Sequence, residues 1–530
     1  MKHLNNGTPV LIEGPSMSGK TRLALETIRS HWPEAPFWFP RDDGDIEQLL
    51  SSSQQPAPHT VILLDDLDRF LSNQSLTLGL LNQWTNNSCI IIATMMHSQY
   101  VKHSDRANEK VSGWDAVNRF KKLTLNPSLS TKEINAVKLT SYANQLPQIK
   151  SIGLGPLLGC AEAVRTAFAD ERKKHSWCGT LIKAAADWRR IGLGPASREQ
   201  LISLSLAHED EAWGTVDWDD TWKQATKFIN HTVPLLRQVG NDRWEVLDTI
   251  ADEADWTISS RTLTSLKNIA LSGQQALQAA VTMFLSKTPS LPTNDMFELA
   301  IKASPNNAVA LGLYALFLET ERGEMDQAQD MYQRAITADP NDAITLRAYA
   351  NFLKNVRGDA DQAQDMYQRA INADPVNATN LGAYALFLIT VRGDMDQAQD
   401  MYQRAINADP QHANNLANYA QILFAKSDNK KAIRLAEKAI FLAGDDQKPL
   451  LTECHFYLFA HSPGHRKESG RALKTLLADG VTTGDWSFEV NLERVRREKG
   501  PRLELLEAVS RTLEDGDMAR LDAFEEWRDL

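Results

Sequence analysis

Cysteine is scarce in this sequence: its 530 residues include four, at positions 89, 160, 178 and 454, and none of them forms a CxxC pair. Scattered cysteines of this kind fit unpaired thiols in a reducing compartment. The first residues, MKHLNNGTPVLIEG, contain no apolar segment of a signal peptide. No apolar run reaches the ~18 residues that a membrane span needs. These absences predict a cytoplasmic protein that does not enter a membrane.

Basic residues are in the minority. The chain has 57 Lys and Arg against 68 Asp and Glu, a net charge of −11. This balance argues against binding of the whole molecule to nucleic acid or to an anionic membrane, although a local basic patch would still allow it. The hydrophobic share of 42% and charged share of 24% are typical of globular proteins. At roughly 100–200 residues per domain, we expect about three to five domains.

One cluster of metal-ligand residue types lies beyond the repeats, at Cys454, His455, His461 and His465. Structural zinc sites usually have ligands in more tightly spaced pairs. We therefore interpret these four as residues near helix ends, with zinc binding as the weaker alternative.

Residues 1–125 alternate short apolar runs with helical stretches, which predicts an α/β domain. The runs are rich in β-branched residues and nearly free of polar ones, as in strands covered on both faces of a parallel sheet. Helices between them complete βαβ units. The expected strands are 10–13, 37–39, 61–64, 89–94 and 123–125.

A phosphate-binding motif follows the first expected strand. Residues 14–21 read GPSMSGKT, the P-loop pattern GxxxxGK[ST], and a helix is expected at 22–29. Gly14 and Gly19 let the backbone turn and approach phosphates, and the helix N-terminus adds positive partial charge. We expect Lys20 to contact the β- and γ-phosphates of ATP and Thr21 to ligate Mg²⁺. The other candidate nucleotide-binding residues here are Pro15, Ser16, Met17, Ser18 and Arg22.

A second element of such a site is expected at the end of strand 61–64, in the sequence VILLDD. Asp65 is the candidate Mg²⁺ ligand, and Asp66 is the candidate catalytic residue, with Lys20, because it would orient or deprotonate the attacking water. Asp68 is the alternative. Thr94 would sense the γ-phosphate or cap its strand. Four arginines are candidates for an arginine finger, and the sequence does not choose among them: Arg41, Arg69, Arg106 and Arg119.

The next two segments are expected to form small domains. Residues 126–175 are predicted to be helical, beginning with a capping box formed by Ser130 and Glu133. Residues 176–258 contain helices followed by a hairpin whose turn lies at 240–242. This order predicts a winged-helix-like domain, or else another small α+β packing domain.

From about residue 275 the chain is repetitive. The segment DQAQDMYQRAI begins at 326, 361 and 396, so its copies start 35 residues apart. A fourth unit ending near residue 443 is about one residue shorter. Two helices per unit of about 34 residues are typical of tetratricopeptide (TPR) repeats. We therefore expect a TPR array with leading helices at 259–443 and a helical C-terminal cap at 444–530.

Such arrays form extended concave surfaces that bind peptides or proteins. The ligand-contact candidates are positions on the first helices that differ between units, and simple solvent exposure is their alternative interpretation. These positions are Arg347, Asn351, Lys354, Asn380 and Asn415. We expect a protein or peptide partner in this groove.

Residues 1–258 resemble the STAND class of signal-transduction ATPases, relatives of AAA+ and NB-ARC modules. The resemblance rests on GPSMSGKT, VILLDDLD, IIIATMM, LTLNPSLSTKEI and IGLGPLL. It implies a P-loop NTPase core of parallel-sheet type, a helical domain and a winged-helix domain. It also implies that Pro156 packs near adenine; without the resemblance, Pro156 is a plain helix break.

Two departures from the family put ADP locking and hydrolysis rate in doubt. The histidine that holds the β-phosphate of ADP in these proteins is missing, since the matching hairpin reads Val246, Leu247 and Asp248. The arginine after the sensor strand is also missing, because Met95 and Met96 follow Thr94. The segment 176–248 has eight basic and eleven acidic residues, which argues against DNA binding by a winged helix.

The favoured hypothesis is an ATP/ADP switch with slow ATP hydrolysis, coupled to sensing of a ligand by the repeats and to nucleotide-dependent homo-oligomer formation. Because the P-loop strand begins at residue 10, we expect output from a partner or from 444–530. By analogy with STAND proteins, the setting would be bacterial signalling or phage defence. ATP is preferred to GTP because no NKxD element occurs.

Three rivals stay open. The first is a constitutive TPR adaptor whose ATP site is structural and barely hydrolyses. The second is a transcription regulator that uses its winged helix, against which the acidic balance argues. The third and weakest is a metabolic kinase, since no site for an acceptor substrate is evident.

Overall fold

The computed structural model describes residues 4, 7–15, 18–40, 43–51, 55–71, 76–104, 114–125, 134, 161–229, 233–252, 254–288, 290–443, 447–483 and 488–530. The chain divides into two compact units, Met1–Pro340 and Asn341–Leu530. Buried hydrophobic clusters lie within each unit. The finer division into five domains expected from the sequence stays a prediction.

The first unit contains a five-stranded parallel sheet in the order β2-β3-β4-β1-β5. All five expected strands are confirmed, although the last begins two residues earlier than predicted. The strands are β1 Val10–Gly14, β2 Phe37–Trp38, β3 Val61–Leu64, β4 Ile90–Met96 and β5 Lys121–Thr124.

Alternate residues of the central strands enter two separate hydrophobic clusters. Leu11, Ile62 and Ile91 belong to one cluster, whereas Ile12 and Ile92 belong to the other. Since successive side chains of a strand point to opposite faces, both faces of the sheet are covered. This double coverage explains why the strands read as continuous apolar runs.

Short helices connect and cover these strands. Thr77 caps one of them, because its side chain accepts a hydrogen bond from the backbone N–H of Leu80. The elements around the sheet are α2 Lys20–His31, α3 Asp43–Ser51, η1 Leu67–Phe70, α4 Leu78–Asn86, α5 His97–Ser104 and α6 Trp114–Arg119.

The rest of the first unit is mainly helical, with two antiparallel ribbons. The predicted hairpin is confirmed by β8 and β9, whose turn contains Asp242 at a φ of 50°. The elements are α10 Ala161–Lys173, α11 Trp177–Arg190, α12 Arg198–Ser205, η4 Leu206–Glu211, α13 Trp218–Ala225, β6 Phe228–Ile229, β7 Val233–Pro234, β8 Leu236–Gly240, β9 Arg243–Val246, α14 Asp248–Asp252, α15 Ser260–Ser265, η5 Leu266–Asn268, α16 Gly273–Leu285, α17 Ser290–Ala303, α18 Ala308–Phe317, η6 Leu318–Arg322 and α19 Met325–Ala338.

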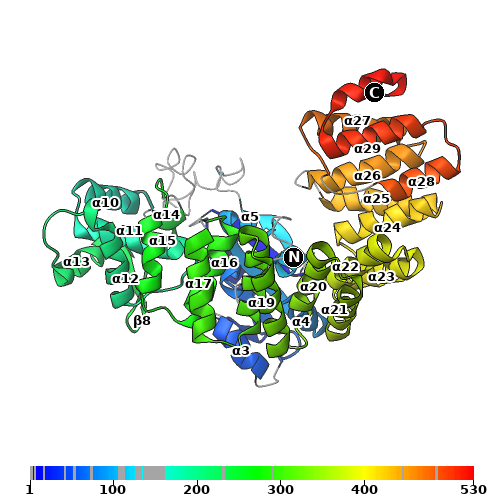
Figure 1. Ribbon diagram of the computed structural model, residues 1–530. Helices are drawn as coiled ribbons and strands as arrows, with labels where there is room; N and C mark the ends of the chain where they lie inside the picture. Colours follow the sequence, from blue (N-terminus) through cyan, green and yellow to red (C-terminus); the bar gives the residue numbers. More distant parts are fainter. Residues whose placement is uncertain are drawn as a thin grey trace. The chain divides into compact units, whose positions relative to one another are not determined.

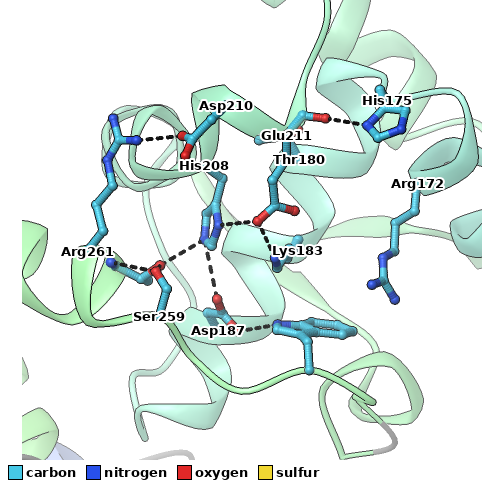
Figure 2. A network of polar contacts seen from close by, with 12 residues as sticks. Arg172, His175, Thr180, Lys183, Asp187, His208, Asp210, Glu211, Ser259 and Arg261 are labelled. Carbon is cyan, nitrogen blue, oxygen red and sulfur yellow. Dashed lines mark hydrogen bonds and ion pairs between the residues drawn. The ribbon is translucent and has the colours of Figure 1, made fainter.

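A buried polar network joins α11, η4 and the segment before α15 (Figure 2). The side chains of Asp187 and His208 are 0% and 2% exposed. The Nε2 of His208 lies 3.3 Å from Oδ2 of Asp187, and its Nδ1 lies 3.4 Å from Oε1 of Glu211. The indole N–H of Trp256 donates to Oδ1 of Asp187 over 2.8 Å. Lys183 pairs with Glu211 at the edge of this network.

The second unit consists of helices that follow one another in pairs, from green through yellow to red in Figure 1. The predicted helical repeats and helical C-terminal segment are confirmed. The elements are α20 Ala343–Phe352, η7 Leu353–Arg357, α21 Ala360–Ala373, α22 Ala378–Phe387, η8 Leu388–Arg392, α23 Met395–Ala408, α24 Ala413–Ala425, α25 Asn429–Ala443, α26 Lys448–His461, α27 Arg466–Ala478, α28 Glu489–Arg497, α29 Leu503–Asp515, η9 Met518–Ala523 and α30 Glu525–Arg528.

A π-helical turn accounts for the length of the repeats. The first helices of three repeats end in the π-helical turns η6, η7 and η8. In the fourth repeat, the first helix α24 is α-helical throughout its described length. An i→i+5 turn holds one residue more than an α turn. Accordingly, Asn377 and Met395 are 18 positions apart, whereas His412 and Asn429, in the fourth unit, are 17 apart. This residue explains why the fourth unit is shorter.

Two kinds of contact link neighbouring repeats of the array. The Nε of Arg392 donates to Oε1 of Gln364 over 2.8 Å, and its guanidinium also pairs with Asp361, both at the start of the preceding second helix. Lys426 makes the equivalent ion pair with Asp396 one unit later. Polar contacts of the same register therefore recur along the array.

The second kind of contact depends on Gly382 in α22. The Nδ2 of Asn415 in α24 donates to the backbone oxygen of Ala378 over 2.9 Å. A Cβ at position 382 would lie 2.0 Å from Oδ1 of Asn415. Only glycine therefore allows this approach.

We expect Gly382→Ala to lower the free energy of unfolding by about 1–3 kcal/mol, because Asn415 must move and lose a buried hydrogen bond. Gly464→Ala is the matched control, since a Cβ there meets nothing within 4 Å. Urea unfolding followed by far-ultraviolet circular dichroism measures both changes. Equal effects of the two substitutions would contradict the packing argument.

Candidate functional site

The loop from Gly14 to Lys20 joins β1 to α2, as the motif predicts. A Cβ at Gly14 would lie 2.8 Å from the backbone oxygen of Leu125, so no side chain fits there. Gly19 has a φ of 88° and precedes the first residue of α2, in the left-handed region that favours glycine. The two glycines are thus required for different reasons. Ser16 and Met17 lie outside the described residues.

Lys20 is buried in this loop, with 7% of the residue's surface exposed. Its Nζ donates to the backbone oxygens of Gly14 and Pro15 over 3.1 and 2.8 Å and lies 3.2 Å from the sulfur of Met96. The hydroxyl of Ser18 is buried without a hydrogen-bond partner. Arg22 is exposed on the first turn of α2.

Three side chains from three elements meet beside this loop. The hydroxyls of Thr21 in α2 and Thr94 in β4 both donate to Oδ1 of Asp65, over 2.7 and 2.6 Å. Asp65 directly follows β3. The backbone N–H of Asp66 donates to the Thr94 hydroxyl over 3.0 Å, which fixes the end of β3 against β4. Hydroxyl and carboxylate oxygens are ligands that Mg²⁺ accepts, so this cluster has suitable chemistry for that ion.

The predicted general-base candidate, Asp66, is held by arginines. Its Oδ2 lies 2.9 Å from Nη2 of Arg69 and 3.7 Å from Nη2 of Arg189, which comes from α11. Asp66 has a φ of 53°, an unusual value for a residue other than glycine. Sequence analysis did not single out Arg189, because no motif marks it and 123 positions separate it from Asp66.

Of the other arginine-finger candidates, the structure describes Arg119 alone. Arg119 donates from Nε to Oδ1 of Asn82 over 3.1 Å. Arg41 and Arg106 lie outside the described residues, as does Pro156.

Glu13 is a further buried group that sequence analysis missed. It lies on β1, next to Gly14, and its side chain is 1% exposed. Burial alone would raise its pKa, but hydrogen bonds from Thr124 and His97 hold that pKa below its ordinary value. The Thr124 hydroxyl lies 2.7 Å from Oε1 and the His97 Nδ1 lies 2.8 Å from Oε2. Glu13 thereby ties β5 and α5 to the strand that leads into the loop.

Asp68 has an unusual charge environment. Burial raises its pKa to about 6, the nearby charge of Asp66 acts in the same direction, and Arg189 and Arg69 oppose the rise. Its Oδ1 is buried without a hydrogen bond.

We expect Asp68→Asn to stabilise the protein at pH 7. An unfolded aspartate titrates near pH 4, so the stabilisation that neutral Asp68 provides below this pH is lost as pH rises to about 6. Asparagine stays neutral, and the gain at pH 7 should be of order 1–3 kcal/mol. Urea unfolding at a series of pH values measures it, and identical profiles for both proteins between pH 4 and 6 would contradict this assignment.

Two cavities border the site. One of about 820 Å³ extends from Asp65 and Asp66 to Arg243 of the hairpin and Gln275 of α16. Another of about 400 Å³ extends from Met96 at the end of β4 to Arg189, Arg190, Thr282 and other residues of the helical layer. The end of the sheet that carries the candidate residues is therefore open to both cavities.

The paired helices and the 35-residue spacing of the repeated segment indicate which kind of repeat the C-terminal half contains. The family described as TmcB, TPR repeats, matches residues 322–380. The C-terminal half thus contains tetratricopeptide repeats, whose role is protein–protein interaction.

Solved structures of other proteins match part of this chain. They include PilF of Pseudomonas aeruginosa (16% identity, 38% of this chain and 91% of that chain, TM-score 0.34). They also include PilW, a type IV pilus biogenesis factor (17%, 38% and 92%, TM-score 0.33), and the TPR protein YrrB (16%, 39% and 95%, TM-score 0.26). No curated protein matches this chain.

The cysteine and histidines beyond the repeats have separate partners. Cys454 is fully buried in α26. His455 lies near the Ser469 hydroxyl, His461 near the Asn491 amide, and His465 near Ser462 and Glu437. Within the described ranges, no group of three or more His, Cys, Asp or Glu residues is arranged to hold a metal ion. Among the helices that the structure describes, none is both long and apolar enough to span a bilayer.

Proposed function

We propose that this chain is a nucleotide-dependent switch, which binds ATP with Mg²⁺ at residues 14–21 and a protein partner on its TPR array. The observation that carries the proposal is the convergence of Thr21 and Thr94 on Asp65 beside the loop that contains Lys20. A P-loop NTPase core needs this arrangement, with a hydroxyl from the loop and a carboxylate from a neighbouring strand on one cation. The parallel sheet, with β1 between β4 and β5, also supports it.

Each candidate residue has a role in this switch. Lys20 neutralises charge on the β- and γ-phosphates, and Mg²⁺ held by Thr21 and Asp65 would further offset that charge. Asp66 orients or deprotonates water, and Thr94 senses the γ-phosphate. The backbone amides of the segment contact phosphate oxygens. The amide donors of this segment are Gly14, Ser16, Met17, Ser18, Gly19 and Arg22, whereas Pro15, which has no N–H, shapes the loop; Pro156 would pack near adenine.

The contacts of Asp66 suggest how the site would communicate. Because Arg189 belongs to α11, an anionic phosphate near Asp66 competes with that carboxylate for the guanidinium. The same helix carries Asp187 of the buried network in Figure 2, which joins it to η4. A change at Arg189 would therefore act on a rigid helix rather than on a mobile side chain alone. This coupling fits slow hydrolysis that resets a signalling state.

A constitutive TPR adaptor with a structural, barely hydrolysing ATP site is the second candidate. It is favoured by the missing histidine at Val246–Asp248 and by Met95 and Met96 after Thr94. The analogy with STAND proteins in bacterial signalling or phage defence belongs to the switch proposal only.

The solution mass of the full chain, measured by light scattering, tests the switch against the adaptor. It is recorded with ADP and then with a non-hydrolysable ATP analogue and Mg²⁺, for the wild-type protein and for Lys20→Ala. We expect the ATP analogue to raise the mass of the wild-type protein alone, since a switch requires a differential affinity for two states. Equal masses in both nucleotides, with nucleotide bound, would favour the adaptor.

A further inference from the structure

The cavity of about 400 Å³ beside the candidate nucleotide site is lined by basic residues from two helices. Lys102 comes from α5, and Arg189 and Arg190 come from the last turn of α11. Among the described residues that line this cavity, none is acidic. The side chains of Arg189 and Arg190 are 16% and 25% exposed, and Lys102 is half-buried, so these cations are partly accessible. Walls that carry charge of one sign attract ligands of the opposite sign.

The two arginines have carboxylate partners at a distance that leaves room for a further anion. Nη2 of Arg189 lies 3.7 Å from Oδ2 of Asp66, and Nη1 of Arg190 lies 3.3 Å from Oδ1 of Asp187. Both distances exceed the roughly 2.7–2.9 Å of a charge-assisted hydrogen bond. Each of these carboxylates also lies closer to another donor. An anion that approaches the guanidinium groups at shorter distance would therefore be a stronger partner for them.

The other walls of the cavity combine apolar surface with hydroxyl groups. Met96, Ile258 and Leu263 supply apolar surface, and Thr282 of α16 supplies a hydroxyl. The backbone after α11 packs closely on this threonine, because a Cβ at Gly192 would lie 2.0 Å from Oγ1 of Thr282. Pockets of this volume that pair apolar walls with a few polar groups are typical of small-molecule sites. The walls thus match a ligand that carries both an anionic group and an apolar ring.

This cavity is separate from the candidate phosphate loop. The described residues that line it include none of residues 14–21, and neither Asp65 nor Thr94. Met96 lines the cavity, and its sulfur lies 3.2 Å from Nζ of Lys20. Met96 therefore forms part of the wall between the cavity and the loop. A ligand in the cavity would lie next to a bound nucleotide without using the residues of the phosphate loop.

We propose that this cavity is a second binding site of the first unit, for a small molecule that carries a phosphate group and an apolar ring. Lys102, Arg189 and Arg190 bind the phosphate, whose several oxygens can accept hydrogen bonds from all three cations. Ile258 and Leu263 contact the ring. The inference goes beyond the nucleotide switch and is independent of it, because no described residue of the phosphate loop lines the cavity.

The test uses the full chain and three probes, 1-naphthyl phosphate, inorganic phosphate and 1-naphthol, whose binding is measured by isothermal titration calorimetry. We expect 1-naphthyl phosphate to bind at least tenfold more tightly than either of the other two, because it alone engages both the cations and the apolar walls. The same result is expected in Lys20→Ala, which removes the positive charge of the phosphate loop. Loss of binding in Lys20→Ala would assign the probe to that loop and overturn the proposal.

Two substitutions on different helices test the cavity itself. The affinity for 1-naphthyl phosphate should fall at least tenfold in Arg190→Met and at least fivefold in Lys102→Met. Lys102 lies on α5, so its variant keeps the contact between Arg190 and Asp187 and decides the question even if Arg190→Met does not fold. Arg198→Met is the matched control. Like Arg190, Arg198 pairs with an aspartate and lies over a tryptophan ring, but it does not line this cavity.

The control should bind the probe with the affinity of wild type. Unchanged affinity in both Arg190→Met and Lys102→Met would overturn the proposal, as would the absence of binding at about 1 mM probe. Equal affinities for 1-naphthyl phosphate and either simpler probe would also overturn it, since the ligand class requires both an anion and a ring. The affinity for ATP, measured separately, decides the nucleotide proposal, so the two can fail independently.

Discussion

Replacing Lys20 by alanine is expected to weaken ATP binding at least a hundredfold, which corresponds to about 2.7 kcal/mol. The lysine is buried in the loop, and its ammonium group is already held by the backbone oxygens of Gly14 and Pro15. It is thus preorganised as the positive charge of the loop, beside the hydroxyl of Thr21 and the carboxylate of Asp65. Alanine leaves the phosphates without that charge, while the helix N-terminus and backbone amides remain.

Titration of the full chain with a fluorescent ATP analogue and Mg²⁺ measures this loss. Lys302→Ala is the matched control, because Lys302 is an exposed residue of α17. The control should bind like wild type. If Lys20→Ala and wild type bind ATP with affinities within threefold of each other, residues 14–21 are not the nucleotide site.

The largest effect on stability is expected from Asp187→Ala, at about 3–5 kcal/mol. The substitution removes the carboxylate that faces His208 and accepts the indole N–H of Trp256. It also removes the partner of Arg190, whose Nη1 lies 3.3 Å from Oδ1. The indole N–H of Trp256 then loses its acceptor, and His208 is left with Thr262 and Glu211 as partners in the buried network that joins α11, η4 and the segment before α15 (Figure 2).

Urea unfolding followed by tryptophan fluorescence reports on this unit, since every tryptophan except Trp486 and Trp527 precedes residue 340. Asp210→Ala is the control. Asp210 also carries an ion pair, with Arg261, but its side chain is 69% exposed, so its loss should change stability by less than about 1 kcal/mol. Similar losses in the two variants would show that burial does not set the value of these pairs.

The strands and helices of this protein follow closely from its sequence. Strands β1, β3 and β4 are buried on both faces, so the sequence shows them as almost wholly apolar runs, with Glu13 and Thr94 as the polar residues. The sequence predicts the bounds of the edge strand β5 less accurately. Its residues are exposed, and its register depends on pairing with β1 rather than on an apolar pattern.

In the candidate nucleotide site, too, the sequence predicts some residues and not others. The loop and Asp65 could be predicted, because neighbours along the chain and the carboxyl end of one strand suffice to define them. Arg189 and Glu13 could not, since their significance comes from contacts across the sheet and from α11. The expected groove positions Arg347, Asn380 and Asn415 are buried rather than exposed, and Asn415 bonds to the backbone oxygen of Ala378 on the preceding first helix.

Ion pairs of the same register recur between neighbouring repeats, so this contact does not depend on which repeat comes next. Arg392 pairs with Asp361, and Lys426 pairs with Asp396, in the same register. Excision of the 35 residues from 359 to 393 would join Gly358 to Asp394 and leave the Lys426 contact intact. Recombination between the near-identical segments can therefore shorten or lengthen the array one whole repeat at a time, and the reach of its binding surface can change in a single genetic step that retains the ion pair between Lys426 and Asp396.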